Sequence, residues 1–139
     1  MLKKVLHLST AMILIMALVL FLPPNCLADE TVLTVSVQKA HEIIKKRTHD
    51  TDFVILDIRT PDEFKAGHLQ NSISLDYYST SFAQQLEKLD KRKTYLVYCR
   101  SGNRSGKALP LFRKMAFKKV YEMGRGIIGW LAEGLPVVQ

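Results

Sequence analysis

The amino-acid sequence predicts an α/β domain built on a mostly parallel β-sheet with helices on both faces. Short apolar runs rich in Val, Ile, Leu and Tyr alternate along the chain with segments of helical periodicity. Strands buried on both faces form continuous apolar runs, and regular strand–helix alternation is typical of parallel sheets covered on both sides. The 139 residues suffice for one such domain and little more.

The first expected elements are a strand, a helix and a central strand. A short apolar run over 32–35 predicts the first strand, and Ser36 can cap the helix that follows it. The apolar residues of this helix recur at helical spacing over 37–44. The continuous apolar run 53–56 then predicts a strand buried on both faces, which ends at Asp57.

A strong helix-start signal comes directly after this strand. Thr60 can act as the N-cap, Pro61 suits the first helical position, and Glu63 completes a capping box. Gly67 ends this short helix, and a small strand is expected over 73–75.

The second half continues the alternation. The pattern predicts a helix over 82–89, a strand over 95–98, a helix over 108–115, a strand over 120–123 and a short helix over 127–133. Pro110 is expected within the first turns of its helix, where a missing N–H costs least. Asp57, Cys99 and Gly124 each follow a strand directly, and ligands of such sheets bind beyond the carboxyl ends of the strands. These three positions are therefore expected at one edge.

The first 28 residues are a different kind of sequence and are interpreted as a secretory signal peptide. Lys3 and Lys4 precede an unbroken apolar run over 11–22, and a small residue, Ala28, follows. A membrane anchor is the alternative, but spanning a bilayer takes about 20 apolar residues, which is more than this run provides. We therefore expect cleavage after Ala28, a single domain over 29–139 with no stable membrane anchor, and a periplasmic or secreted location.

Charge and cysteine usage restrict the partners of the mature domain. Removal of the signal leaves 18 basic and 13 acidic residues, a net charge of +5 that favours small anionic substrates. The basic residues are scattered, so no nucleic-acid partner is expected. Cys26 leaves with the signal, and the single remaining Cys99 is a candidate reactive thiol, since exported domains usually use cysteines in pairs.

Cys99 opens a loop whose composition favours a thiolate. Arg100 and Arg104 supply positive charge, and Gly102 and Asn103 tolerate the positive φ angles that let successive N–H groups converge on an anion. The alternative is an inert, buried cysteine at a strand end. We take Cys99 as the candidate nucleophile, and the candidate substrate-binding residues are Arg100, Ser101, Gly102, Asn103, Arg104 and Ser105.

Three segments carry a family resemblance. Residues 56–69 (LDIRTPDEFKAGHL), 98–105 (YCRSGNRS) and 123–130 (MGRGIIGW) resemble, in this order, the first signature, the active-site loop and the closing segment of rhodanese domains. The chain resembles in particular small periplasmic single-domain thiosulfate sulfurtransferases. The resemblance implies that a persulfide forms on Cys99 from thiosulfate and passes its sulfur to cyanide or another thiophilic acceptor. Arg125 departs from the family, where many members have Gly, and leaves the acceptor open.

Other polar residues of the first signature are expected to be supporting groups. Asp57 and Arg59 are expected to pair and to brace the loop from behind, while Glu63 is explained by capping. His68 follows a turn and is expected to make structural hydrogen bonds. No cofactor or metal is expected, because a ring of N–H groups with two arginines can hold a persulfide anion without one, and the HExx start at His41 lacks a second His.

Two other functions remain open at this point. Phosphatases and arsenate reductases of related fold carry a Cys-x5-Arg loop, commonly with His before the Cys. Here the spacing from Cys99 to Arg104 is Cys-x4-Arg and Tyr98 precedes it, which suits sulfur better than a tetrahedral oxyanion. The second alternative is a sulfur carrier or partner-binding module, and turnover without any protein partner would separate it from an enzyme.

Overall fold

The computed structural model describes residues 31–139, so the predicted signal peptide lies outside the described residues. Five parallel strands form one sheet in the order β1-β5-β4-β2-β3. The strands are β1 (Val32–Val35), β2 (Phe53–Asp57), β3 (Ser72–Ser74), β4 (Thr94–Tyr98) and β5 (Lys119–Met123). The helices are α2 (Val37–Lys46), α3 (Pro61–Ala66), α4 (Phe82–Glu87), α5 (Asn103–Lys114) and α6 (Gly126–Ala132). The predicted α/β class with a parallel sheet is confirmed.

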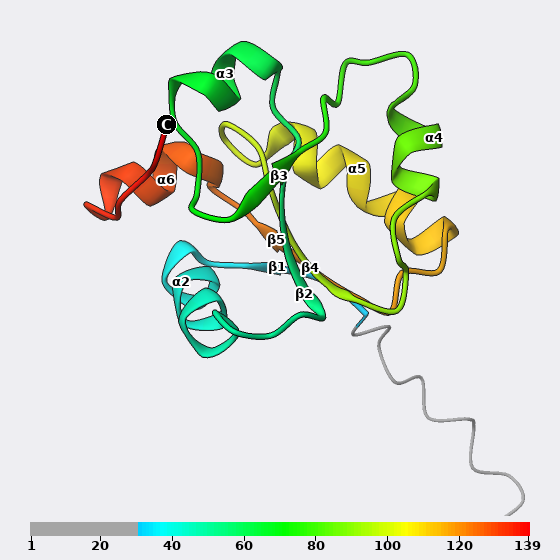
Figure 1. Ribbon diagram of the computed structural model, residues 1–139, viewed down its shortest axis with the longest axis horizontal. Helices are drawn as coiled ribbons and strands as arrows, with labels where there is room; N and C mark the ends of the chain where they lie inside the picture. The colour runs from blue at the N-terminus through cyan, green and yellow to red at the C-terminus, as the bar shows by residue number, and fades with distance from the viewer. Residues whose placement is uncertain (1–30) are drawn as a thin grey trace, which may run out of the picture.

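Helices cover both faces of this sheet (Figure 1), and each face has its own core. One core joins the sheet to α4 and α5 and contains Leu86 and Phe112, which are fully buried. The other joins the sheet to α2 and α6 and contains Ala40 and Trp130. Buried β4 lies between them with Leu96 on one side and Val97 on the other. This double burial explains why the sequence of the central strands is apolar without alternation.

Local signals set the ends of the helices. The Ser36 side chain accepts a hydrogen bond from the N–H of Lys39 at the start of α2, and α3 begins with a complete capping box between Thr60 and Glu63. Gly67 ends α3 at a φ of 152°. In the described part of the chain, no helix is long and apolar enough to cross a membrane.

The position expected for Pro110 is wrong. Helix α5 already begins at Asn103, so Pro110 lies in its interior rather than in its first turns. The apolar stripe starts later than the helix because the first turn of α5 belongs to the polar loop. The carbonyl that loses its partner at Pro110 is that of Gly106, which is exposed to solvent and so can be hydrated.

Candidate active site

Cys99 lies at the carboxyl end of β4, where the chain turns into the loop that leads to α5. Its side chain is buried, with 1% of the residue exposed. The start of α6 holds the backbone of this loop: the N–H of Ile127 donates to the carbonyl of Cys99 at 2.9 Å, and that of Ile128 donates to Arg100 at 3.0 Å. The sequence predicts that this loop and the segment after β5 lie at the same edge of the sheet. In the structure the two segments are in direct backbone contact.

These two hydrogen bonds orient the peptide groups around the sulfur. A peptide carbonyl and the N–H of the next residue point in opposite directions, so carbonyls drawn toward α6 leave the following N–H groups facing the other way. The N–H of Ser101, which follows the carbonyl of Arg100, is one of the backbone donors to the Cys99 sulfur. The N–H of the next residue, Gly102, also donates to it, with the nitrogen 3.2 Å from Sγ. The loop thus presents donors to the sulfur while its acceptors are satisfied elsewhere.

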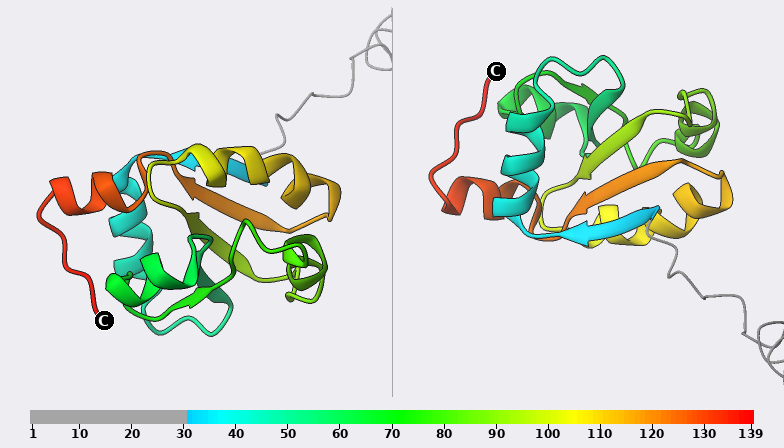
Figure 2. Two further views of the ribbon diagram at one scale, coloured as in Figure 1. Left: turned by 90° about the horizontal axis from the view of Figure 1, so that it is seen from above. Right: turned by 90° about the horizontal axis from the view of Figure 1, so that it is seen from below.

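The loop after β4 passes close to the β5–α6 turn (Figure 2), and two glycines permit this approach. Gly102 has a φ of +91°, and a Cβ atom there would lie 1.9 Å from the carbonyl oxygen of Gly124. Gly126 has a φ of +53°, and its Cβ would lie 2.4 Å from the carbonyl oxygen of Cys99. Any side chain at either position would push the two segments apart and move the donors away from the sulfur.

The surroundings of Cys99 favour its ionised form. Burial by itself raises the pKa of the thiol, because it disfavours the thiolate. Hydrogen bonds from the Ser105 hydroxyl and from the backbone of Ser105, Ser101 and Gly102 outweigh burial and hold the pKa of Cys99 below its ordinary value. The Ser105 hydroxyl lies 3.4 Å from the sulfur. Neutral donors, rather than a bonded cation, carry this shift.

The outer side of the loop is polar and lines a pocket. Arg100, Ser101 and Asn103 are exposed, and no hydrogen bond or ion pair holds the side chain of Arg100 within the described chain. The pocket is lined by Glu63, Tyr78, Arg100, Ser101, Asn103 and Arg104. Four of these six residues come from the predicted substrate-binding set, whereas Gly102 and Ser105 lie on the inner side with the sulfur.

Arg104 is engaged by a partner that the sequence analysis assigned only to capping. Both of its terminal nitrogens donate to the carboxylate of Glu63 at 2.7 Å, and its guanidinium lies 5.4 Å from the ring centre of Tyr78. The hydrogen bonds from Arg104 lower the pKa of Glu63 to about 2. Glu63 therefore has two tasks: it caps α3 and fixes the guanidinium at the rim of the pocket.

Asp57 and Arg59 form the expected pair. Arg59 Nη2 lies 2.6 Å from Asp57 Oδ2, and both side chains are almost fully buried. The same nitrogen donates to the carbonyl of Gly67 at 2.7 Å, and the guanidinium lies 5.6 Å from the ring centre of Tyr98. The pair thus braces the end of α3 and the residue before Cys99, and neither side chain contacts the sulfur.

Two residues near the site were missed by sequence reasoning. Glu122 is 2% exposed, and its Oε1 lies 2.6 Å from the hydroxyl oxygen of Ser105, which is also within hydrogen-bonding distance of the sulfur. Its signal was available, because it is an acid within the apolar strand 120–123. Tyr78 is 67% exposed at the rim of the pocket, and nothing in the local sequence marks a loop tyrosine as part of a site.

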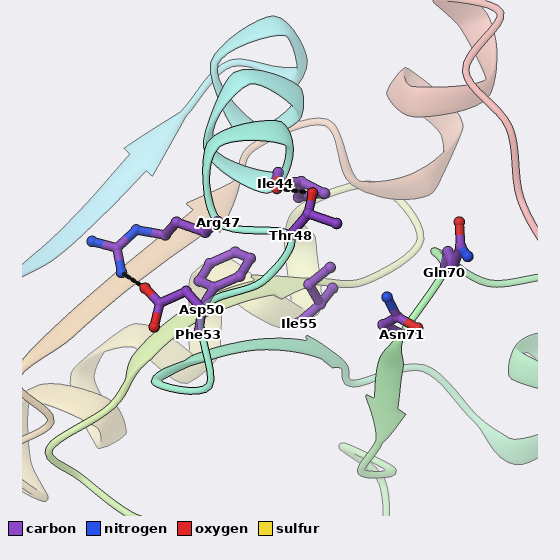
Figure 3. Close-up of a pocket in the computed structure, with 8 residues that line it drawn as sticks. All are labelled: Ile44, Arg47, Thr48, Asp50, Phe53, Ile55, Gln70 and Asn71. Atoms are coloured by element: carbon purple, nitrogen blue, oxygen red, sulfur yellow. Dashed lines mark hydrogen bonds and ion pairs between the residues drawn. The ribbon is translucent and has the colours of Figure 1, made fainter.

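A second cavity lies beside the C-terminal end of α2 and the start of β2 (Figure 3). It is lined by Ile44, Arg47, Thr48, Asp50, Phe53, Ile55, Gln70 and Asn71. Arg47 is paired with Asp50 at 2.8 Å, the Thr48 hydroxyl donates to the carbonyl of Ile44, and the lining contains no cysteine. Residues 31–139 hold no group of three or more His, Cys, Asp or Glu that could bind a metal ion. The Cys99 pocket is therefore the candidate catalytic site.

A family model supports the same reading of the site. The Rhodanese-like domain model matches residues 39–133, which include the Cys99 loop and both segments that brace it. The chain belongs to the rhodanese-like domain family. A sulfurtransferase from Allochromatium vinosum is 33% identical over 98 residues, covering 70% of this chain and 90% of that protein. The thiosulfate sulfurtransferase GlpE of Coxiella burnetii is 34% identical, with 70% and 86% covered.

Solved structures agree with this assignment. A rhodanese-related protein from Thermoplasma volcanium superposes with a TM-score of 0.63 at 30% identity, covering 76% of this chain and 96% of that one. The polysulfide-sulfur transferase of Wolinella succinogenes gives 0.62 at 27% identity, with 78% and 79% covered. The domain also occurs within longer proteins of other activity: a segment of a tRNA uridine(34) hydroxylase from Pelagibacter ubique is 34% identical over 62% of this chain and 29% of that protein. The relatives support a transferase activity of the rhodanese type.

Proposed function

We propose that this rhodanese domain is a thiosulfate sulfurtransferase that carries a sulfane sulfur as a persulfide on Cys99. The observation that carries the proposal is the converging set of hydrogen-bond donors at a buried sulfur, which favours a thiolate without a metal. A thiolate is the form of cysteine that attacks a sulfur centre. The sulfurtransferases among the relatives add support for this class of reaction.

The reaction runs in two displacement steps. The Cys99 thiolate attacks the outer sulfur of thiosulfate, the sulfur–sulfur bond of thiosulfate breaks, and sulfite leaves with the electron pair. The persulfide anion that results carries its charge on the outer sulfur. Cyanide or another thiophilic acceptor then takes that sulfur, leaves as thiocyanate or its equivalent, and restores the thiolate. Charge balances in each step, so no oxidant or reductant is needed.

The pocket residues are assigned by where they lie. Gly102 and Ser105 donate to sulfur from the inner side and are suited to hold the thiolate and the persulfide. Arg100 and Arg104 are suited to receive the sulfonate of thiosulfate at the pocket wall, with Ser101 and Asn103 beside them. Arg125 is exposed at the start of α6, where its charge can bias the choice of acceptor.

Intact mass measurement tests the proposal directly. Purified protein treated with thiosulfate should gain the mass of one sulfur atom, and added cyanide should remove it and release thiocyanate. Cys99→Ser should fold normally, gain no sulfur and lose all turnover, because a serine hydroxyl stays protonated near neutral pH. Turnover by the Cys99→Ser variant would overturn the assignment.

The same experiment decides the carrier alternative. An enzyme with small-molecule substrates turns over thiosulfate and free cyanide with no other protein present. A sulfur carrier that depends on a protein partner gains the sulfur but passes it to free cyanide only very slowly. Steady turnover of thiosulfate and cyanide without a partner would exclude the carrier alternative, and a persulfide that persists in the presence of cyanide would support it.

Export is the second part of the proposal. The basic, apolar and small-residue order of residues 1–28 supports cleavage after Ala28 and a periplasmic or secreted domain that begins at Asp29. N-terminal sequencing of the protein recovered from the exported fraction checks this. A mature protein that begins at Met1 and stays in the membrane fraction would contradict it.

A further inference from the structure

Glu122 is a carboxyl group buried beneath Cys99 in the apolar strand β5. It is 2% exposed, and its register partners on the neighbouring strands are Thr34 and Val97, neither of which titrates. Within residues 31–139 no Lys, Arg or His side chain forms an ion pair with it. Because an unpaired buried charge is costly, this carboxyl needs a specific reason to be there.

The hydrogen bonds around Ser105 supply that reason. Its Oγ lies 2.6 Å from Glu122 Oε1 and 3.4 Å from Cys99 Sγ, both within hydrogen-bonding distance. A serine hydroxyl has only one hydrogen to donate, so it can serve the carboxyl oxygen or the sulfur but not both. A continuous chain of hydrogen bonds from Cys99 through Ser105 to Glu122 therefore needs one more hydrogen, which is bound either to the sulfur of Cys99 or to the carboxyl group of Glu122.

We propose that Glu122 accepts the proton of the Cys99 thiol through Ser105 when the thiolate forms. Before transfer, the thiol donates to Ser105 Oγ and the Ser105 hydroxyl donates to an ionised Glu122. After transfer, the protonated Glu122 donates to Ser105 Oγ and the Ser105 hydroxyl donates to the thiolate. Each of the two protons moves by one position, one S–H bond breaks, one carboxyl O–H bond forms, and the total charge of the three residues stays at one negative unit.

Constant charge is the physical advantage of this arrangement. The two distances together place Cys99 Sγ and Glu122 Oε1 no more than 6.0 Å apart. A thiolate and a carboxylate at that separation inside the protein would repel each other strongly, whereas the relay leaves only one of them ionised.

The cations nearby do not neutralise a second negative charge at Glu122. On α5, Arg104 is bound to Glu63, and Arg113 donates to the carbonyl of Val32. Arg100 and Arg125 are exposed to solvent at the loop and at the start of α6. Proton transfer along Ser105 is then the available way to relieve the repulsion.

The inference deepens the proposed function, because it assigns the proton acceptor of the same nucleophile. It can still be tested without a sulfur donor, since the proton equilibrium exists in the protein alone. Failure of the relay with normal persulfide formation would remove Glu122 from the mechanism and leave sulfur transfer in place. Failure of persulfide formation with an intact relay would contradict the proposed sulfur transfer and leave the role of Glu122 as proton acceptor in place.

Proton release on alkylation is the decisive measurement. The folded full-length protein is treated with iodoacetamide in weak buffer with an indicator dye, at the lowest pH where the ultraviolet band of the thiolate is fully developed, because a remaining thiol would itself release a proton on alkylation. Alkylation removes the charge of Cys99, so Glu122 should ionise again and release about one proton per thiolate consumed. A thiolate beside a permanently ionised Glu122 would release none, and that result would overturn the proposal.

Glu122→Gln is the informative variant. Its amide N–H can donate to Ser105 as the protonated carboxyl does, so the thiolate should persist while proton release on alkylation disappears. Glu42→Gln is the matched control, because Glu42 is 58% exposed on α2 and pairs with Lys39; it should behave like the wild type. Proton release that persists undiminished in Glu122→Gln would assign the proton to another group and overturn the proposal.

An infrared measurement keeps the test independent of that variant. The wild-type difference spectrum before and after alkylation should show the loss of one protonated carboxyl band and the gain of a carboxylate band. Isotope labelling of the glutamate carboxyl groups should shift both bands. A spectrum without a carboxyl band, recorded while the thiolate is present, would show that Glu122 does not hold the proton.

Discussion

The loop after β4 has two different sides. Its inner side is buried and offers neutral hydrogen-bond donors, whereas its outer side is exposed and carries charged side chains. On the inner side, Gly102 and Ser105 donate to the sulfur, and the turn at Gly124 presses against the loop backbone. On the outer side, Arg100 extends free and Arg104 is fixed by Glu63. The inner side sets the state of the thiol, and the outer side is left to meet an anion from solvent.

Under the proposed function, this difference would let seven consecutive residues supply both a nucleophile and a binding surface. Backbone donors act over short, fixed distances and lose nothing to salt screening, so they suit the permanent task of holding the thiolate. Exposed arginines act over longer range and are screened, so they suit the transient task of attracting a substrate. Perturbing each side should therefore give a different experimental signature.

The largest effect is expected from adding a side chain where the inner side of the loop contacts Gly124. Gly102→Ala places a Cβ 1.9 Å from the Gly124 carbonyl at a φ of +91°, so the loop must move. We expect a loss of about 2–3 kcal/mol of stability, from steric strain and the unfavourable φ, together with near-complete loss of activity. Chemical denaturation measures the loss of stability, and the rate of thiosulfate turnover measures the loss of activity.

Gly106→Ala is the matched control for this substitution. A Cβ at Gly106 meets no atom within 4 Å, and the residue lies in the first turns of α5. Alanine should leave activity unchanged and stabilise the helix by up to about 1 kcal/mol. Equal damage from the two substitutions would show that the helix start, and not the contact with Gly124, controls the loop.

The next effect is expected on the outer side at Arg104. Arg104→Ala removes a charge at the pocket wall, and we expect kcat/KM for thiosulfate to fall about 100-fold. Loss of the partly exposed ion pair between Arg104 and Glu63 should lower the free energy of unfolding by only about 1 kcal/mol. Lys107→Ala removes an exposed positive charge from the same helix and should have little effect. A collapse of Tm in Arg104→Ala would mean that its role is structural.

A smaller effect is expected at Arg100. Arg100→Ala should raise KM for thiosulfate by about threefold to tenfold with kcat nearly unchanged, because the exposed side chain acts by attraction. Added salt should raise the KM of the wild type toward that of the variant, since screening weakens the same attraction. A KM that responds to neither change would place Arg100 outside the substrate path.

The smallest effect is expected from Glu63→Gln. The glutamine carbonyl oxygen can keep the capping box, so the variant removes the negative charge and one of the two acceptors that Arg104 uses. The pKa of Glu63 is lowered from 4.5 to about 2 in the folded protein. The ion pair therefore stabilises the protein fully above pH 4.5, and this contribution is lost as the pH falls to about 2. The wild type should exceed the variant by about 1 kcal/mol near neutral pH, and the two stabilities should converge at about pH 2. A pH-independent difference would contradict the pairing.

The sequence by itself determined the fold and the place of the site. Continuous apolar runs at 53–56 and 95–98 predict central strands, and both strands occur within one residue of these bounds. The capping box at Thr60 and the strand–loop–helix around Cys99 are local features, set by residues close together in the chain. Parallel topology then puts the strand ends at one edge, so the sequence alone could bring Asp57, Cys99 and Gly124 together.

Only the tertiary structure decided the partners. The Glu63–Arg104 pair spans 41 positions and Glu122–Ser105 spans 17, and no local pattern encodes which side chains meet at such separations. Because the capping box already accounts for an acidic residue at position 63, no feature of the sequence indicated that Glu63 also binds Arg104. Glu122 differs, because an acid within an apolar strand signals a buried polar contact without naming its partner. Packing of α5 against the sheet places Ser105 between that acid and Cys99, and Ser105 satisfies the buried Oε1 of the carboxyl because it lies within hydrogen-bonding distance.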